Sequence, residues 1–433
     1  MQKRKSILFL FFSLLLAGGL FGQESGSNDL PRQSADGAAE QTGAAAQDFS
    51  ALKIVQFNIE GLKRTKRSYM DGLLSEFLQK PASPQTLKGV ETLLQAQNLF
   101  DEIKVAARPL GEDAAVVDIS FKEKWSVLPM PFGYYTDGAY ALGLFVMDVN
   151  TFGLRCTTVA GGIYSPSSVM GAAAFQKPAS QKGKLGFSVA ANVSKAAHTL
   201  TNSKNRGVFS YENFYAGGRA SLLFKPTNNM SASVGAGYSF FNPIDSSNVN
   251  RSHQWSLSAS WGISSSDWNG YFLCSNSLNL GMEFLFSDNP DQRFAQIWTF
   301  NAQVQRSIFG RVRLVTAARG FFSNDLHVTN FASRSSSGLT LLPKNFLSPQ
   351  VFGFFTGFEL VVIKIKYGMM SVYALYGVAA ARDWDKSLYA CHGPEAGVRF
   401  YLSKIAFPAF AMGASYNIEE NKFQYSISGG VSF

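Results

Sequence analysis

The stretch WSLSASWGIS at residues 255–264 separates its side chains into two kinds. Apolar residues occupy the odd positions, and the even positions hold only Ser and Gly. Successive side chains of a strand point to opposite faces, so this rhythm predicts a strand with one apolar face and one face of small polar groups. Its ten residues are about the length that a tilted strand needs to cross a bilayer.

The same alternation recurs along most of the chain after a composition change near Trp125, for example at 185–194 and 278–286. A soluble β-sandwich alternates too, but its outward face would carry Lys, Glu and Thr, whereas Ser, Gly and Asn suit the interior of a barrel. We therefore expect a transmembrane β-barrel over 125–433, with about 16 antiparallel strands. They are expected near 130–135, 139–147, 154–164, 168–177, 184–194, 212–225, 230–241, 253–264, 275–287, 292–305, 311–322, 352–365, 368–382, 389–402, 406–417 and 423–433. A long extracellular loop is expected in the gap 323–351.

The composition agrees with strands that face lipid. Aromatic residues make up 14% of the chain and charged residues only 16%, where a soluble domain carries about 25% charge. Beyond residue 22 no apolar run reaches the length of a spanning helix. Strands hide apolar side chains in alternation, so the chain can enter a membrane without such a helix.

The last expected strand ends on a terminal phenylalanine and alternates apolar residues with Gln, Ser and Gly. This pattern resembles the C-terminal recognition signal of bacterial outer-membrane barrels, which offers the assembly machinery an edge to pair with. The residues of this expected signal are Phe423, Tyr425, Ile427, Val431 and Phe433.

The N-terminal region predicts export. A cationic patch, Met1–Lys5, precedes an apolar run, Ile7–Leu16, that is too short for a spanning helix and gives way to small residues up to Gly22. We expect residues 1–22 to be a secretory signal peptide; the alternative is a retained N-terminal anchor. Residues 23–50 contain almost no large apolar side chain and therefore predict a disordered linker.

Residues 51–124 have the pattern of a small α+β domain. A strand is expected at 52–59, helices at 69–78 and 84–94, and further strands at 102–108 and 114–123. Ser83 followed by Pro84 predicts an N-cap with proline at the first helical position. Two helices over a three-stranded sheet need about 75 residues, which this stretch supplies.

Three motifs in this domain resemble a POTRA repeat. They are IEGLKRT at 59–65, LFDEIKV at 99–105 and VDISFKE at 117–123, in the order and spacing of that family. The resemblance implies one POTRA domain of βααββ order, whereas BamA-type assembly factors usually carry several.

Residues 51–433 as a whole resemble the BamA and two-partner-secretion (TpsB) superfamily, also called the bacterial surface antigens. DVNTFG at 148–153 is similar to the D-x-N-x-x-G segment after the family's first hairpin, and GPEAGVRFYL at 393–402 is similar to one of its final strands. The resemblance implies a barrel in the bacterial outer membrane, a POTRA domain in the periplasm, and work on other polypeptides.

The sequence departs from this family at one interaction. In the family, a loop that folds back into the lumen carries V-R-G-F, and its arginine pairs with an acidic residue, often in F-x-D-A-G. Here the loop position holds LPKNF at 342–346 and the strand position holds VAAA at 378–381, so both partners are gone. Losing both together is physically coherent, because a buried charge without its partner is strongly destabilising. Four charged residues remain as candidates for the loop and lumen: Lys344, Glu359, Glu395 and Arg399.

RGF at 319–321 would supply the literal tripeptide. Arg311, Arg313 and Arg319 share one parity of an ordinary strand that enters the loop, so we assign this tripeptide to the strand and not to the loop.

Two functions from different classes fit these features. The leading hypothesis is help in inserting or translocating outer-membrane or secreted polypeptides, with the POTRA sheet edge at 52–59 or 102–108 capturing an extended client by strand addition. The alternative is a passive pore or a structural surface-exposed barrel whose POTRA domain only docks to an assembly complex. The expected partners are outer-membrane lipids, unfolded outer-membrane or secreted polypeptides, and subunits of an assembly complex.

We expect no enzyme activity, no cofactor and no metal site. The four histidines occur singly, the three cysteines stand more than a hundred residues apart, and no nucleophile-elbow, zincin or phosphate-loop motif is present. The net charge of +9 is scattered, which is typical of a solvated surface, so no nucleic-acid partner is expected.

Overall fold

The computed structural model describes residues 49–429 except for gaps at 98, 137–138, 180–184, 205, 228, 246–249, 270–271, 290–292, 325–330, 334–336, 344–345, 366–367 and 403–407. The expected signal peptide, the expected linker up to residue 48, and Val431 and Phe433 of the expected C-terminal signal lie outside the described residues. The chain divides into two compact units. Among the described residues, the small domain comprises 49–128 together with Met147–Thr158, and the barrel comprises Pro129–Val146 and 159–429.

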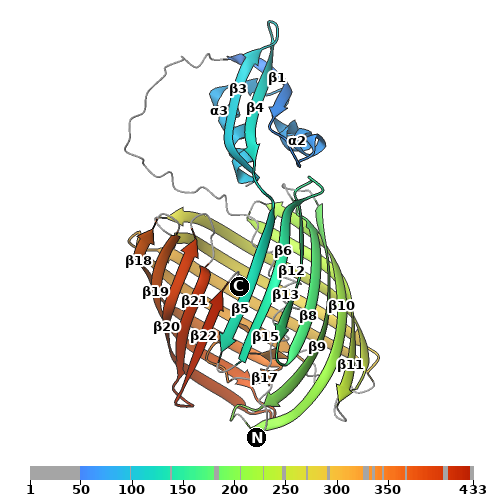
Figure 1. The fold of residues 1–433 in the computed structure, drawn as a ribbon, viewed down its shortest axis with the longest axis vertical. Helices are drawn as coiled ribbons and strands as arrows, with labels where there is room; N and C mark the ends of the chain where they lie inside the picture. Colours follow the sequence, from blue (N-terminus) through green and yellow to red (C-terminus); the bar gives the residue numbers. More distant parts are fainter. Residues whose placement is uncertain are drawn as a thin grey trace. The chain divides into compact units, whose positions relative to one another are not determined.

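The small domain is a sheet with two helices against it (Figure 1). In chain order its elements are β1 (Phe49–Glu60), α2 (Arg67–Leu74), the 3-10 turn η2 (Ser75–Phe77), β2 (Pro81–Ala82), α3 (Pro84–Ala96), β3 (Phe100–Pro109) and β4 (Ala114–Glu123). The sheet order is β2-β1-β4-β3, with β1 parallel and β3 antiparallel to β4. The expected order of strands and helices is present, with β2 as an extra short strand and with β1 starting at Phe49. Neither helix of the described chain is long and apolar enough to cross a bilayer.

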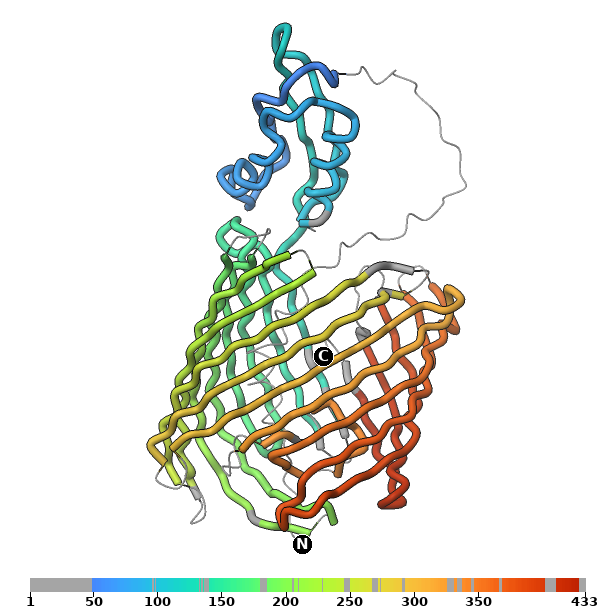
Figure 2. Tube along the Cα trace, turned by 180° about the vertical axis from the view of Figure 1, so that it is seen from behind, coloured from blue at the N-terminus to red at the C-terminus, as the bar shows by residue number. Residues whose placement is uncertain are grey.

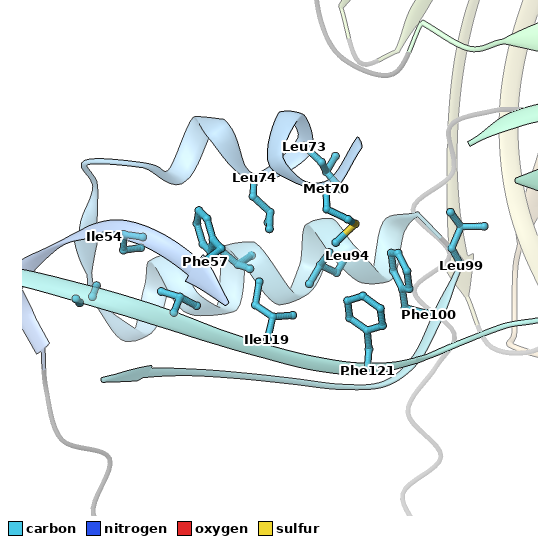
Figure 3. Packing of buried hydrophobic residues seen from close by; sticks show 14 residues of the cluster. Ile54, Phe57, Met70, Leu73, Leu74, Leu94, Leu99, Phe100, Ile119 and Phe121 are labelled. Atoms are coloured by element: carbon cyan, nitrogen blue, oxygen red, sulfur yellow. The ribbon is translucent and has the colours of Figure 1, made fainter. Parts of the chain in front are cut away.

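Apolar stripes of both helices meet one face of the sheet to form the core of the small domain (Figure 3). Leu74 of α2, Leu94 of α3 and Ile119 of β4 are fully buried there, and the rings of Phe100 and Phe121 lie 4.1 Å apart. The start of α3 is fixed as expected, because the Ser83 hydroxyl accepts a hydrogen bond from the Thr86 N–H.

Strands β1 and β3, which flank β4 on its two sides, differ in how the backbone groups on their far edges are used. Along β1, Ile54 bonds through its N–H to Lys80 and through its C=O to Gln79, and the Phe57 carbonyl accepts from the Arg67 guanidinium at 2.6 Å. The outer edge of β1 is therefore occupied by its own domain. Strand β3 pairs only with β4 among the described strands of this sheet and presents its other edge outward.

The barrel contains sixteen antiparallel strands in closed order, which confirms the predicted architecture. Figure 2 shows the strands following one another around the wall with a common tilt. Their bounds are β5 (Val127–Thr136), β6 (Ala139–Thr151), β7 (Cys156–Ser165), β8 (Ser168–Lys177), β9 (Leu185–Thr201), β10 (Gly207–Thr227), β11 (Met230–Asp245), β12 (Ser252–Asn269), β13 (Phe272–Ser287), β14 (Phe294–Ser307), β15 (Val312–Ser323), β18 (Gln350–Ile365), β19 (Gly368–Arg382), β20 (Leu388–Leu402), β21 (Pro408–Asn417) and β22 (Lys422–Gly429). The loop between β15 and β18 holds a further pair of short strands, β16 (Ala332–Ser333) and β17 (Leu347–Ser348).

Side chains alternate between the two faces of the barrel wall as the sequence predicts. On β19, Val372, Tyr376 and Val378 are exposed, whereas Ser371, Tyr373, Leu375 and Ala379 between them are buried. Exposed apolar side chains also line the outside of β6, β12 and β18, among them Leu142, Leu144, Leu257, Phe352 and Phe358. An apolar exterior of this extent is unfavourable in water and is typical of a surface that meets lipid.

The core of the small domain predicts the effect of truncating α3. Leu94→Ala removes a fully buried side chain and should destabilise the domain by about 2–5 kcal/mol, because a cavity remains between α3 and the sheet. Leu110→Ala, at a half-exposed hairpin position, serves as the control and should change stability by less than about 0.5 kcal/mol. Amide hydrogen exchange in β1 and β4 of the full chain measures both; equal protection in the two variants would contradict the packing described above.

Candidate functional site

A buried carboxylate organises the charged side chains of the barrel interior. Glu359 on β18 is fully buried. Arg313 lies directly opposite it on β15, and Arg399 lies opposite Ser371 on the neighbouring β19 and β20 pair. The Glu359 carboxylate accepts hydrogen bonds from Arg313 Nη2 (2.6 Å), Arg399 Nη1 (2.8 Å), Ser371 Oγ (2.5 Å) and Tyr401 Oη (2.7 Å).

The two arginines are held by further contacts. Arg313 also donates to Gln305 Oε1 at 2.9 Å, and its guanidinium lies over the Phe272 ring. The Arg399 guanidinium lies 4.1 Å from the centre of the Tyr373 ring. The cluster thus ties β14, β15, β18, β19 and β20 together with two positive charges and one negative charge. Removing the glutamate would leave the buried Arg313 and the partly exposed Arg399 without this counter-ion.

The loop between β15 and β18 folds against the interior face of the wall. Leu339, Leu341, Leu342 and Phe346 are buried and pack against β19 and β20 at Ala379, Ala381 and Cys391. The loop fits because the wall is built there from small residues, Gly353, Gly377, Ala379 and Gly393, which we call the socket. A Cβ at Gly353 would lie 2.2 Å from Leu339 Cδ2, and one at Gly377 would lie 3.0 Å from Leu341 Cδ1.

The polar contacts of this loop come from the wall. The Leu341 carbonyl accepts from Asn417 Nδ2 at 2.9 Å, and Thr340 Oγ1 donates to Glu395 Oε2 at 2.5 Å. Arg319 belongs to β15, as the strand parity indicates, and its side chain donates to the Ser337 carbonyl at 3.3 Å. Charged groups of the wall therefore bind neutral groups of the loop, and apolar packing supplies the rest of the contact.

The loop also takes part in a contact across one mouth of the barrel. The turn between β9 and β10 and the turn between β19 and β20 lie on opposite walls, since seven strand-to-strand steps separate β10 from β19 and likewise β9 from β20. Nevertheless Ser203 in the first turn donates through its N–H to Asp383 Oδ2 in the second at 3.1 Å, and its hydroxyl bonds the same oxygen. The rings of Phe331 and Trp384 lie 5.6 Å apart, so the loop packs against the second turn.

Three of the four predicted charged residues have a place in this interior. Glu359 and Arg399 are brought together, Glu395 binds the loop, and Lys344 lies outside the described residues. No sequence signal marks Ser371, Tyr401 and Asn417 as members of this interior, because small or aromatic polar residues on a strand do not reveal their partners. Within the described ranges, no group of His, Cys, Asp and Glu side chains could hold a metal ion.

The cluster around Glu359 predicts a large loss of barrel stability on its removal. Glu359→Ala should cost about 3–5 kcal/mol, because the buried Arg313 guanidinium and the partly exposed Arg399 guanidinium lose their counter-ion. Glu212→Ala, which breaks a solvent-exposed pair with Lys195, should cost about 0–1 kcal/mol. The temperature at which the folded band disappears in detergent electrophoresis reports both variants, and a Glu359 variant as heat-resistant as the Glu212 variant would refute the assignment.

Comparison with known proteins identifies the architecture. No family model matches the sequence, and no curated protein matches it at the level of sequence. Among solved structures, BamA from Haemophilus ducreyi lacking POTRA domains 1–3 is similar, with a TM-score of 0.63 and 12% identity over 88% of this chain and 85% of that chain. CdiB from Escherichia coli is similar with a TM-score of 0.57 and 12% identity over 95% of this chain and 94% of that chain. CdiB from Acinetobacter baumannii is similar with the same TM-score and identity over 88% of this chain and 74% of that chain. This chain therefore has the fold of the BamA and CdiB barrels.

Proposed function

We propose that this chain is a bacterial outer-membrane barrel that assists the insertion or translocation of other polypeptides, with its small domain, of POTRA type, in the periplasm. The apolar exterior of the wall supports a place in a lipid bilayer. The fold shared with BamA and CdiB supports work on polypeptides. The observation that carries the proposal is the seam where the first and last strands of the barrel meet.

This seam joins two strands that no turn connects. Within the described residues, Ser426–Gly429 of β22 pair with Gly133–Thr136 of β5. Gly133 lies directly opposite Gly429, and a glycine on each strand contributes no side-chain packing across the ladder. Strands β5 and β22 can therefore separate without splitting a hairpin and offer two edges to an incoming client strand.

The edge of β3 is the surface we propose for initial capture of a client. The Leu110 N–H bonds to the Ala114 carbonyl, and Ala107 lies opposite Val117 in the same ladder. Because hydrogen-bonded and non-hydrogen-bonded pairs alternate along an antiparallel ladder, the backbone groups of Val105 and Ala107 point outward. Their side chains pack toward the helices. An extended segment can pair with this edge without disturbing the core.

The alternative of a passive pore finds less support. The Ser203 and Asp383 turns meet across one mouth, and the loop residues Leu342 and Phe346 are buried in the interior. A wide and permanently open channel would not have protein across its opening.

Removing one outward N–H of β3 tests client capture. Ala107→Pro deletes that donor while the ladder to β4 stays intact, since edge positions tolerate proline. Insertion of a urea-denatured porin into proteoliposomes that contain the full-length chain should slow about fivefold, as one backbone hydrogen bond is lost. Ala107→Val keeps the N–H and should insert the porin at the wild-type rate. Equal rates for all three proteins would remove capture at β3 from the proposal.

The covered mouth gives a separate expectation for conductance. The purified chain in planar bilayers should show only rare openings. Replacing residues 331–348 by a short Gly-Ser linker should produce a steady current, because described side chains of that segment, among them Leu342, Phe346 and Leu347, pack in the interior. A large steady current from the unaltered chain, independent of any client, would favour the passive pore.

A further inference from the structure

Residues from separate sequence motifs converge on one carboxylate at the end of β4. Glu123 Oε2 accepts from the backbone N–H groups of Lys63 (2.7 Å) and Arg64 (2.9 Å). Its Oε1 accepts from the N–H (2.9 Å) and the hydroxyl (2.7 Å) of Thr65. Asn150 adds its side-chain amide, which donates to Thr65 Oγ1 at 2.8 Å and to Glu123 Oε1 at 3.2 Å. The first and third POTRA-like motifs and the DVNTFG segment thus meet at Glu123.

Two glycines allow this close approach. Gly61 has a φ of +100°, and a Cβ there would lie 1.9 Å from the Phe121 carbonyl oxygen. Gly153 has a φ of +69°, a Cβ there would lie 2.1 Å from the Arg64 carbonyl oxygen, and its own carbonyl accepts from the Lys66 N–H at 2.9 Å. Any other residue at either position would push the two segments apart.

Arg64, next to Thr65, also forms hydrogen bonds with residues near the ends of two barrel strands. Ser126 immediately precedes β5, and Asp148 and Asn150 lie near the end of β6. Arg64 donates to Ser126 Oγ at 2.7 Å and to Asp148 Oδ2 at 3.0 Å, and Ser126 Oγ donates to Asp148 Oδ1 at 2.7 Å. All of these residues belong to the small domain.

We propose that Arg64, Thr65 and Glu123, together with Ser126, Asp148 and Asn150, form a joint that fixes the ends of β5 and β6 and thereby controls how readily β5 separates from β22. The name "joint" refers to these six residues below. The inference rests on the seam of the proposed function, and it adds that the small domain regulates this seam through named side chains.

The chemistry of the joint makes it sensitive to single changes. Asn150 is fully buried and Thr65 nearly so, so loss of the Thr65 hydroxyl leaves the buried Asn150 amide and the partly exposed Glu123 carboxylate each short of a partner. Burial alone would raise the pKa of Glu123, but the hydrogen bonds from the Thr65 hydroxyl and the three backbone N–H groups outweigh burial and hold that pKa below its ordinary value. The carboxylate is therefore ionised at neutral pH, and its hydrogen bonds are charge-assisted.

The test uses a reporter of the seam that needs no client. Tyr135 and Ile427 are paired across β5 and β22, so the full chain carrying Tyr135→Cys and Ile427→Cys forms a disulfide under copper phenanthroline at a rate set by how long the seam stays closed. Into this background we place Thr65→Val, which removes the hydroxyl at nearly constant shape, and Asn150→Ala. Thr65→Ser restores the hydroxyl. Gln97→Ala is the matched control, since it removes two side-chain hydrogen bonds of the small domain, to Tyr69 and to the Leu93 carbonyl, outside the joint.

Thr65→Val and Asn150→Ala should slow disulfide formation about threefold or more and accelerate amide exchange at 63–65 about fivefold. Thr65→Ser and Gln97→Ala should leave the disulfide rate unchanged. Faster exchange at 63–65 with an unchanged disulfide rate would show that the joint is only local structure and would overturn the inference. Unchanged exchange would overturn it as well, because the hydrogen bonds would then be absent. Since no client is present, failure of porin insertion alone leaves this result standing.

Discussion

Closure of the hydrogen-bonded ladder is the constraint on which the rest of the barrel depends. A backbone N–H or C=O that faces hydrocarbon has no water to bond, so each strand in a bilayer must pair on both sides. Sixteen strands in closed order meet this requirement, and fifteen of the sixteen neighbour contacts join barrel strands that are consecutive along the chain. The sixteenth must join the two ends of the barrel segment, β5 and β22. The pairing of β5 with β22 is therefore the place where the barrel can open without splitting a hairpin.

A ring of sixteen strands creates a second problem, because its interior is wide enough to hold an aqueous channel. This chain fills part of that space in two ways. Buried charges that satisfy one another around Glu359 tie neighbouring strands together, and the loop before β18 lays leucine side chains on the glycine and alanine residues of the socket. The socket explains how apolar contact holds the loop against the wall. Apolar contact needs small residues on the wall, and the sequence supplies them at Gly353, Gly377 and Gly393.

The bounds of the strands were predictable where apolar and small polar residues alternate, and less predictable where a strand continues past the alternating segment. The expected segments 168–177 and 368–382 coincide with β8 and β19. Strand β9 was expected to end at 194 but continues to Thr201, since after Ser194 the ladder goes on while Lys195 and His198 interrupt the apolar pattern. For the cluster around Glu359, strand parity predicted only which side chains face the interior, and not which of them meet. Whether Glu359 meets Arg313 depends on a register between β15 and β18, and the loop that separates those strands leaves this register open in the sequence.

The contacts within the joint could not be predicted from the sequence either, although the sequence motifs contain several of its residues. Composition places the end of the small domain near Trp125, yet the structure assigns Met147–Thr158 to it as well. This happens because a carboxylate that draws on backbone N–H groups of one loop leaves room for one more donor, and Asn150 provides it from a segment far along the chain. Gly61, Thr65, Glu123 and Asn150 lie in three separate segments of the sequence, and their spacing does not reveal that these segments meet in the fold. Thr65, Glu123 and Asn150 are joined by one carboxylate that accepts hydrogen bonds from both segments, so residues near the end of β6 take part in the small domain.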